Sequence, residues 1–498
     1  MVDSKEALAL VVKLSERLAL RAKKIKPRFE YLEADQPLKF ATEKWKTIHA
    51  SRYKEFSDNW CEVVASAAVD RLRVDGFRIG DDEQTPDERE LWVDWQRAEM
   101  TAQSNEGFMS SVVASRSAVI VWADDDGEPE PTWELPEEVI VDYFPGSRRR
   151  RRAALKVWTD DELEFATLYL PDGLWKWFRP ASISERARAR LVEAGLDIPT
   201  LDLGHAGWQP REVPGEAWPL PNPLGVVPVV EVLNRPRRGG QPISDIDGVM
   251  AMQDTANPMW SYLFPAADHA SMPARVITGG EPPRVPVLDD AGQVVGSRPA
   301  KMEELEAGRF LYLPGASGID SWEAAKNDYF IGVIREAIAH IAAQTRTPGH
   351  YLLSNEKFAN LNGDALTAAE VPLATKVENF QLHASPDIKE IAALMALVRD
   401  KKPFADQIRS TPALQFVHWK DGAINSLAQL ADAATKDKSI GMSLRTILER
   451  RYGFTSEQVD REMQRIREEA MDPVTQAFVD ELGGAGAGAG PATAPVGG

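Results

Sequence analysis

The sequence predicts an α+β protein, because segments with a helical period and segments typical of strands occupy separate stretches of the chain. Apolar residues recur every three to four positions near both ends, whereas residues 117–178 contain short β-branched and aromatic runs divided by turn-formers. The chain of 498 residues also exceeds what one hydrophobic core usually serves. Two to four domains, or a long subunit built from several segments, are therefore expected.

Composition narrows the class of protein. The hydrophobic fraction of 43% and the charged fraction of 27% are ordinary for a soluble protein. No apolar run approaches the ~20 residues that span a bilayer, and the N-terminus lacks the h-region of a signal peptide. A single cysteine, Cys61, excludes an intrachain disulfide and is expected to be a small buried apolar side chain. We therefore expect a protein that is made and kept in a cytoplasm.

The net charge of −18 bears on nucleic-acid binding. A protein that grips DNA neutralises phosphates with Lys and Arg and usually presents a basic face. An acidic chain is a poor candidate for a high-affinity duplex binder, but it is compatible with a conduit through which DNA slides.

The N-terminal half is predicted to begin with a helix over residues 4–24, in which Asp3 and Glu6 are spaced as an N-cap and its partner. A second helix over residues 59–71 leads into a short strand at 77–79. An irregular stretch ends the half at about Gly240. Between them, further strands are predicted at residues 118–122, 139–143, 153–158, 165–169 and 174–178.

Two long helices flank a β-rich insert in the second half. Residues 244–270 have a helical period, with a kink expected at Pro258, and the insert covers residues 274–319. The most regular helix is predicted from Ser321 to Thr345. Its apolar stripe is wider than a two-helix hairpin can bury, so neighbouring subunits are expected to cover it.

The C-terminal part is predicted to be mainly helical. After a break at residues 347–349, Asp364 caps a helix that continues to about Phe380, and a strand follows at 414–419. The region 425–470 is helical, with a capping box at Thr455 and Gln458. The Gly, Ala and Pro-rich end of the chain is expected to be disordered.

The sequence contains no recognisable catalytic constellation. The phosphate-binding loop G-x-x-x-x-G-K-[ST] and the motifs G-x-S-x-G and H-E-x-x-H are absent, and the seven histidines are scattered. We predict no catalytic, cofactor-binding or metal site, and no enzyme activity.

Two charged runs leave alternatives open. The run Asp124-Asp125-Asp126 lacks the alternate spacing of a calcium loop, which favours a solvated turn over a metal site. The run from Arg148 to Arg152 could contact phosphate or a partner protein, but five adjacent residues that enter a strand cannot all face one partner. A solvated turn is the favoured interpretation there too.

Six segments, taken in order, resemble the portal proteins of siphophage-type tailed bacteriophages. The resemblance covers residues from about 28 to 470. Two departures are Ala34, where the family more often has Gly, and Asn362, where Ser is common. The segments are YLEADQPL at residues 31–38, the helix-to-strand element at 59–78, PLGVVPVV at 223–230, the stretch 244–279, NLNGDAL at 360–366 and ERRYGFT at 449–455.

The resemblance implies a portal-protein architecture with a mixed α/β wing, a two-helix stem, a small α/β clip and a helical crown. The subunit would belong to a ring, usually of twelve copies, at one capsid vertex, through which genomic DNA is packaged and ejected. In this sequence the implied parts are the wing at 1–240 and 364–421, the stem helices at 241–272 and 321–346, the clip at 273–320, the tunnel loop at 347–363, the crown at 422–475 and a disordered tail at 476–498.

The resemblance also assigns residues. The tunnel loop would line the DNA channel through His350, Tyr351, Asn355, Lys357, Phe358 and Asn360. The stem would form the interface between subunits through Trp260, Phe264, Tyr329, Phe330, Ile334, Ile338 and Ile341.

The implied partners are further copies of the chain, the major capsid and scaffold proteins, the terminase large subunit, the head–tail adaptor and double-stranded DNA without sequence specificity. No membrane is implied. The location would be the virion, with assembly in the host cytoplasm. Two alternatives remain at this point: a metal-dependent DNA-processing enzyme that uses Asp124 and Asp126, and another minor virion head protein.

Overall fold

The computed structural model shows a mixed α/β chain with several sheets, divided into two compact units. The first unit comprises Met1–Ile25, Ser66–Ser244 and Asn360–Gly498, and the second comprises Lys26–Ala65 and Asp245–Ala359. The structure describes residues 2–36, 58–80, 85–147, 149–160, 163–180, 207–237, 241–271, 275–278, 284–289, 292–300, 310–313, 320–321, 327–353, 363–422, 427–454 and 456–471.

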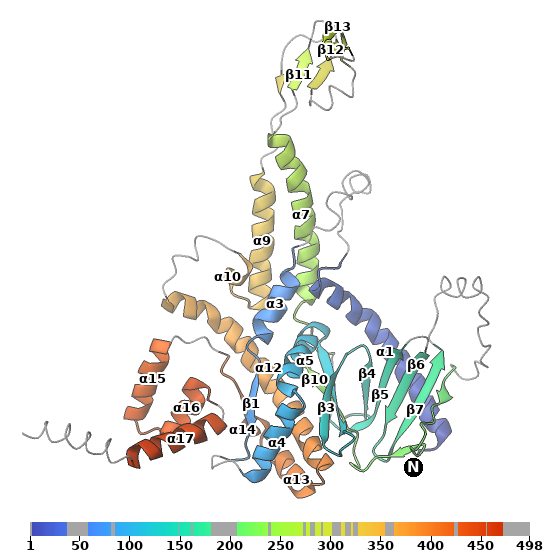
Figure 1. Ribbon diagram of the computed structural model, residues 1–498, viewed down its shortest axis with the longest axis vertical. Helices are drawn as coiled ribbons and strands as arrows, with labels where there is room; N and C mark the ends of the chain where they lie inside the picture. The colour runs from blue at the N-terminus through green and yellow to red at the C-terminus, as the bar shows by residue number, and fades with distance from the viewer. Residues whose placement is uncertain are drawn as a thin grey trace, which may run out of the picture. The chain divides into compact units, whose positions relative to one another are not determined.

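Two antiparallel sheets form the centre of the first unit (Figure 1). The larger sheet has the order β4 (Val139–Tyr143), β5 (Arg151–Asp160), β6 (Leu163–Tyr169), β7 (Gly173–Pro180) and β8 (Gln209–Pro210), and β9 (Leu220–Pro221) also pairs with β7. The smaller sheet has the order β10 (Val229–Leu233), β2 (Arg116–Ala123) and β3 (Pro129–Glu134).

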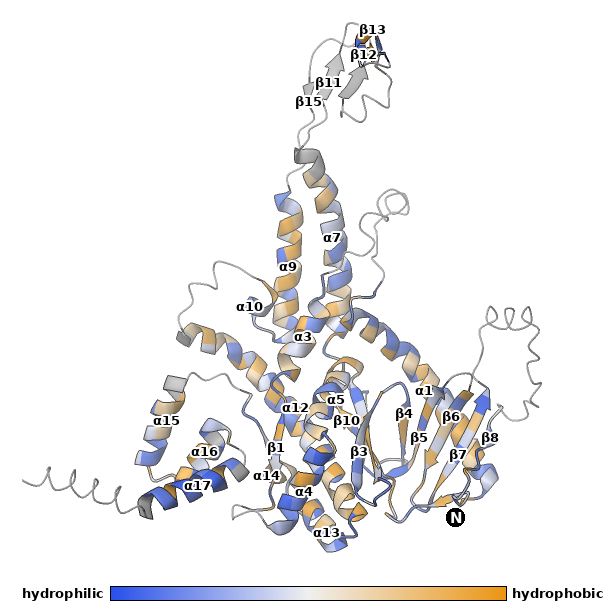
Figure 2. Cartoon of the chain, viewed as in Figure 1, coloured by the Kyte–Doolittle hydropathy of each residue, from blue (hydrophilic) through white to orange (hydrophobic). Residues whose placement is uncertain are grey.

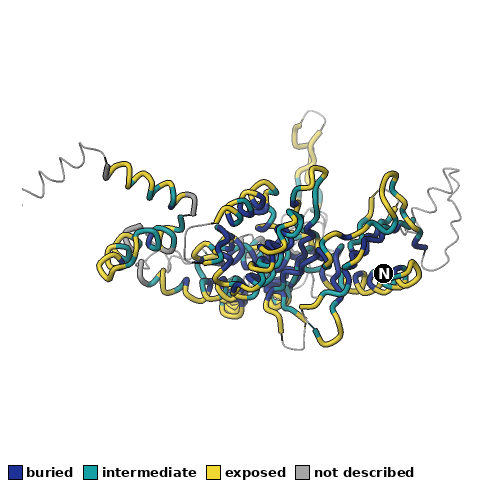
Figure 3. Tube along the Cα trace, turned by 90° about the horizontal axis from the view of Figure 1, so that it is seen from below, coloured by how far each residue is buried: buried dark blue, intermediate teal, exposed yellow. Residues whose placement is uncertain are grey.

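Both faces of the larger sheet are buried, because successive side chains of a strand point to opposite faces. Leu155 on β5 and Leu168 on β6 pack with helix α1 (Ser4–Leu32), which presents Val11 and Leu14 from its apolar stripe. The opposite face carries Ala154 and its neighbours, which pack against β2 and β10 of the smaller sheet. Figure 3 shows the buried residues in dark blue.

Helices cover the remaining side of the smaller sheet. They are α5 (Met100–Ala114) and the 36-residue helix α12 (Gly363–Val398). An aromatic cluster of Phe77, Trp92, Trp95 and Phe416 joins the strand ribbon β1–β16 to the nearby helices α4 and α14. The bounds of these elements are β1 (Val74–Phe77), α4 (Pro86–Arg97), α13 (Lys402–Ser410), α14 (Ala413–Phe416) and β16 (Val417–Trp419).

Three further helices, α15 (Leu427–Ser439), α16 (Leu444–Tyr452) and α17 (Ser456–Met471), end the described part of the first unit. Ser443 caps α16, since its hydroxyl accepts from the Thr446 amide. Gly453 ends that helix with φ 65°, a conformation that glycine adopts without a steric penalty.

The second unit is built on two helices, α7 (Asp247–Ser271) and α9 (Asp328–Thr345), which lie side by side in Figure 1. They are antiparallel, because a Cβ at Gly248 would lie 3.2 Å from Oε1 of Gln344 at the far end of α9. The unit also contains part of α3 (Trp60–Val69), α10 (Gly349–Leu352), and the strands β11 (Arg275–Thr278), β12 (Arg284–Leu288), β13 (Val294–Pro299), β14 (Phe310–Leu313) and β15 (Asp320–Ser321).

Both helices are amphipathic, with polar and apolar residues distributed around them (Figure 2). Among the residues that the structure describes, no helix is long and apolar enough to cross a membrane.

Several predicted elements are confirmed. Strand β4 has the predicted bounds, and the strands at 118–122, 153–158, 165–169 and 174–178 are extended by one or two residues at one or both ends. The Glu6 amide donates to the Asp3 carboxylate at 2.8 Å, as the spacing of the cap predicted. Cys61 is buried as expected, and burial raises the pKa of its thiol to about 12.

Other element predictions were wrong in extent. The first helix continues to Leu32, and the helix from Gly363 continues past Phe380 to Val398, because tertiary packing overrides the prolines inside both helices. The helix predicted from Ser321 begins at Asp328, while Asp320–Ser321 is a strand. Residues 322–326 of the predicted helix lie outside the described residues.

The remaining differences are elements that local patterns did not show. The segment 414–419, predicted as one strand, is split between α14 and β16. The stretch before Gly240, predicted to be irregular, contains β8, β9 and β10. The sequence analysis also did not predict β3, β12, β13, α4, α5 and α13. The predicted cap at Thr455 and the predicted tail at 476–498 lie outside the described residues.

The turn after α1 is kept although Ala34 replaces the glycine that the family prefers. Ala34 has φ 60°, and the Asp35 amide donates to the Glu30 carbonyl at 2.8 Å. This hydrogen bond belongs to a Schellman motif, in which a left-handed residue follows the helix. The alanine therefore retains the turn at a steric cost of about 1–2 kcal/mol.

Gly107 on α5 lies against the ring of Trp133 on β3, where an added Cβ would lie 2.1 Å from a ring atom. We predict that Gly107→Ala lowers the free energy of unfolding by about 1–3 kcal/mol, although alanine favours helix elsewhere. Urea denaturation measures this change. Gly332→Ala on α9, where a Cβ meets nothing within 4 Å, is the control and should not be destabilising. An equal free energy of unfolding for the two variants would contradict the close contact between Gly107 and Trp133.

Candidate functional site

Helix α9 has one face that is buried within the chain and, beside it, apolar residues that stay exposed. The face that packs toward α7 carries Ile334, Ala337, Ile338 and Ile341, each at most 4% exposed. Its partner residues on α7, at heptad spacing, are Val249, Ala256 and Leu263. Tyr329, which is 73% exposed, and Val333, which is 46% exposed, lie beside this face and about one helical turn apart.

The residues predicted for the interface between subunits therefore divide into three groups. Ile334, Ile338 and Ile341 are already covered inside the chain, whereas Tyr329 is exposed. Phe330 is half-buried. Trp260 and Phe264 on α7 are half-buried and stack with ring centroids 6.1 Å apart. The sequence pattern did not separate the two faces, because one broad stripe included both.

Polar side chains on α7 hold the start of α3. The buried Gln253 accepts through Oε1 from the amides of Trp60 and Cys61, at 2.9 and 3.1 Å. Asn257 accepts from the Asp58 amide and donates back to its carbonyl. These bonds replace the missing intrahelical partners at the N-terminus of α3, so the two helices are joined without a salt bridge.

The tunnel-loop prediction is only partly within the described residues. His350 and Tyr351 lie on α10, directly after the end of α9, with ring centroids 4.7 Å apart. Tyr351 is 38% exposed. The other predicted residues, Asn355, Lys357, Phe358 and Asn360, lie outside the described residues.

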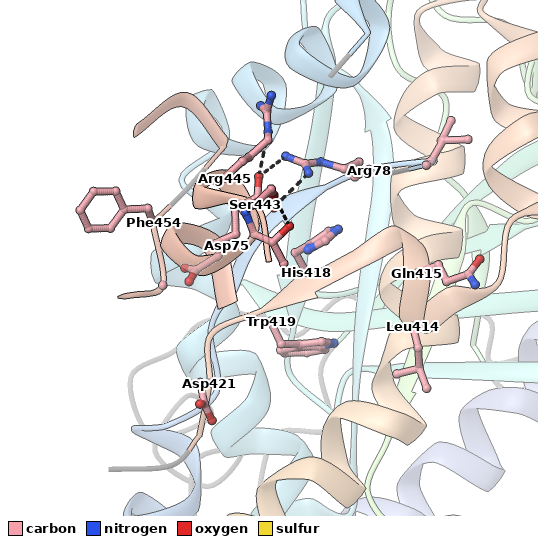
Figure 4. A pocket seen from close by; sticks show the side chains of 15 residues that line it. Asp75, Arg78, Leu414, Gln415, His418, Trp419, Asp421, Ser443, Arg445 and Phe454 are labelled. Atoms are coloured by element: carbon pink, nitrogen blue, oxygen red, sulfur yellow. Dashed lines mark hydrogen bonds and ion pairs between the residues drawn. The ribbon is translucent and has the colours of Figure 1, made fainter. Parts of the chain in front are cut away.

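A cleft of about 950 Å³ lies between the β1–β16 ribbon and helix α16 (Figure 4). Arg78, from the end of β1, points to Glu449 on α16 and donates to both of its carboxylate oxygens, at 3.2 and 2.9 Å. Arg445 also contacts Glu449 and pairs with Asp460 on α17. The local sequence pattern did not show this cleft, because its walls come from residues 75–80, 414–421 and 443–454.

Three charged groups of this cleft, Arg78, Arg445 and Glu449, are paired with one another. Glu449 receives two guanidinium groups, and Arg78 is only 5% exposed. Trp419 donates its indole N–H to Ser385 at 2.8 Å. Such a network fixes α16 against β1, and none of these contacts pairs a nucleophile with a general base.

The Asp124 turn uses its carboxylate locally. Oδ1 of Asp124 accepts from the amides of Asp126 and Glu128, at 3.0 and 2.7 Å. Within the described part of the chain, no three His, Cys, Asp or Glu side chains are grouped so that they could hold a metal ion. This geometry gives the metal-dependent alternative no support.

A buried carboxylate, Glu231 on β10, joins three other elements of the first unit. It accepts from Arg21 on α1 and Arg116 on β2, both at 3.2 Å, and from the Tyr143 hydroxyl on β4 at 3.0 Å. Burial alone would raise the pKa of Glu231, but the two guanidinium charges outweigh it and hold the pKa below its ordinary value.

The pKa of Asp387 on α12 is shifted in the opposite direction from that of Glu231. Burial raises the pKa of its carboxyl to about 8, against the opposing effect of the Leu233 amide, and the charge of Glu231 adds to the rise. The folded protein therefore holds a proton on Asp387 at neutral pH that the unfolded chain releases.

This proton gives a pH-dependent prediction. Because the pKa of Asp387 is raised on folding, its contribution to stability is full below about pH 4 and is lost as the pH rises to about 8. Asp387→Asn, which stays neutral, should therefore gain stability relative to the natural protein between pH 5 and pH 9. Urea midpoints at the two pH values measure this. Asp125→Asn, at an exposed turn, is the control, and parallel pH profiles for Asp387→Asn and the natural protein would refute the assignment.

Taken together, the described sites consist of a helix pair with an uncovered apolar face and of ion pairs that join elements, as in a structural protein. The sequence matches the family described as phage portal protein, SPP1 Gp6-like, over residues 13–474. The chain belongs to this family of phage portal proteins. Portal proteins are structural and not enzymatic, so the chain is a structural protein of a phage virion.

Among curated proteins, none is similar enough in sequence to match. Solved structures with some similarity include the neck of a native GTA particle computed with C12 symmetry, at 11% identity and a TM-score of 0.36, covering 83% of this chain and 94% of that one. The virion of a native gene transfer agent particle matches at 11% identity and a TM-score of 0.32, covering 85% and 98%. At such TM-scores the similarity carries no argument, and the assignment rests on the family match.

Proposed function

We propose that this portal protein assembles into a ring of about twelve subunits at one capsid vertex, and that the ring is the channel for genome packaging and ejection. The observation that carries the proposal is the uncovered apolar face of α9, on a chain whose family match spans nearly its whole length. A face with Tyr329 and Val333 exposed is covered at low cost by a neighbouring copy.

In this proposal α7 and α9 are the two stem helices, within the expected ranges 241–272 and 321–346. The wing is formed by residues 1–240 and 364–421, the clip by 273–320, the tunnel loop by 347–363 and the crown by 422–475. The sheets and their covering helices would then form the wing, and α15 to α17 the crown.

The exposed face of α9 supplies the test of ring assembly. Val333→Glu should abolish rings in negative-stain images, because a carboxylate would be buried without a partner at the contact between subunits. The helical content should stay unchanged, since this side chain is 46% exposed in the single chain.

The matched control is Val93→Glu on α4, where the side chain is 55% exposed and lies outside the proposed stem. It should leave rings intact. Rings as abundant for Val333→Glu as for the natural protein would exclude Tyr329 and Val333 from the interface between subunits.

We also propose that the tunnel loop faces DNA and guides it through contacts that do not depend on sequence, such as Lys357 with phosphate and Tyr351 or Phe358 against the duplex. Deleting residues 354–357 leaves the buried Leu352 in place and should reduce the packaged and retained DNA per particle. Unchanged packaging and retention in complementation assays would rule out this role.

The clip is proposed to dock the terminase large subunit during packaging and later the head–tail adaptor. Hairpin β12–β13 supports this, because Leu288, Val294 and Val295 are each more than half exposed near its turn. Replacing Leu288 and Val294 with serine should weaken co-sedimentation of the ring with the adaptor while rings still form. Full co-sedimentation of that variant would contradict the docking role. The ring would also contact the major capsid and scaffold proteins, and assembly would take place in the host cytoplasm.

A further inference from the structure

The turn between β4 and β5 carries the densest positive charge of the chain and is closed by its own hydrogen bonds. The Phe144 amide donates to the Arg150 carbonyl at 3.0 Å, and the Ser147 hydroxyl accepts from the amides of Arg149 and Arg150. Gly146 supplies the left-handed residue with φ 77°. These hydrogen bonds fix the backbone of the described residues of the turn.

Arg148 lies outside the described residues, and the other four arginines of the run separate into two groups. Arg151 pairs with Glu390 on α12 at 2.6 Å, and Arg152 donates to Asp142 on β4 at 2.9 Å, so these two charges are neutralised inside the chain. Arg149 and Arg150 are exposed, and among the described residues neither has a carboxylate within ion-pair distance. The guanidinium of Arg150 lies 4.9 Å from the ring centroid of Phe144, which is itself 38% exposed.

The surroundings of the turn do not compensate this charge. Glu390 is shared between Arg151 and Arg409, so one carboxylate serves two guanidinium groups. Lys389 donates to the carbonyls of Arg409 and Thr411, at 3.0 and 2.9 Å, and not to a carboxylate. Burial lowers the pKa of Lys389; the charge of Glu390 opposes this shift, and the charge of Arg149 adds to it. Positive charge therefore accumulates at this point on a chain whose net charge is −18.

We propose that Phe144, Arg149, Arg150 and Lys389, here called the arginine knuckle, dock an acidic segment of a partner protein that carries an aromatic side chain beside its carboxylates. A guanidinium binds a carboxylate through two parallel hydrogen bonds, and the exposed ring of Phe144 offers an aromatic contact next to them. The knuckle is separate from the stem, the tunnel loop and the clip, and it does not depend on ring formation.

A protein segment suits the knuckle better than duplex DNA for two reasons. The surface holds three cations in a small area, which neutralises few phosphates of a duplex. The exposed aromatic ring adds a contact that the phosphate backbone cannot use. Binding should therefore depend on Phe144 as well as on the two arginines.

Fluorescence anisotropy of the full chain tests this with two labelled probes, a 16-residue peptide of repeated Glu-Phe-Glu-Glu and a duplex DNA of about 16 base pairs. The peptide should bind more tightly than the duplex, and Arg149→Ala/Arg150→Ala should weaken it by about tenfold or more. Phe144→Ala should weaken the peptide several-fold with little effect on the duplex. The control Arg89→Ala/Arg467→Ala removes two exposed arginines elsewhere and should bind like the natural protein.

Tighter binding of the duplex, lost in the same arginine variant, would overturn the choice of a protein partner. Peptide affinity that is unchanged by Arg149→Ala/Arg150→Ala would overturn the site itself. Arg149→Lys/Arg150→Lys keeps the charge and should recover part of the affinity, which separates a lost contact from a misfolded turn. Rings of normal appearance in all of these variants would show that a failure here is independent of the proposed assembly.

Discussion

The buried carboxylate of Glu231 is the constraint on which the first unit depends most. It lies between the two sheets and receives Arg21 from the N-terminal helix, Arg116 from the smaller sheet and Tyr143 from the larger one. A carboxylate removed from water is tolerated only when its oxygens are paired, so these elements must meet in one arrangement. The apolar cores on the two faces of the larger sheet are built from residues of these same elements.

A different principle organises the second unit. Apolar residues at heptad spacing close α7 on α9, while amide side chains on α7 cap the neighbouring helix α3. The apolar residues of α9 are nevertheless only partly covered inside the chain, since Tyr329 and Val333 stay exposed. A single chain of this kind leaves apolar surface exposed, and the proposed ring would bury that surface between neighbouring subunits.

Local patterns predicted what local physics determines. Strands β4 to β7 of the larger sheet and the two long helices follow from side-chain period, and the Asp3 cap follows from spacing. The full length of α12 was not predictable, because its second half depends on distant contacts such as the ion pair of Glu390 with Arg151, which are 239 residues apart. The cleft beside α16 depends in the same way on Arg78 and Glu449, 371 residues apart.

The candidate sites likewise combine features that are visible in the sequence with features that depend on the fold. The broad stripe of the second stem helix was visible in the sequence, but which of its residues the chain itself covers depends on the path of α7. The arginine run was visible too, whereas the neutralisation of Arg151 and Arg152 by Glu390 and Asp142 required the fold. A run of like charge does not reveal its own counterions when those lie on another element.

Native mass measurement of the purified full-length protein tests the central claim most directly. A closed ring of twelve 55.1 kDa chains has a mass of about 660 kDa, and a single species at or near this whole multiple is the predicted result. A 55.1 kDa monomer at every protein concentration would contradict the account.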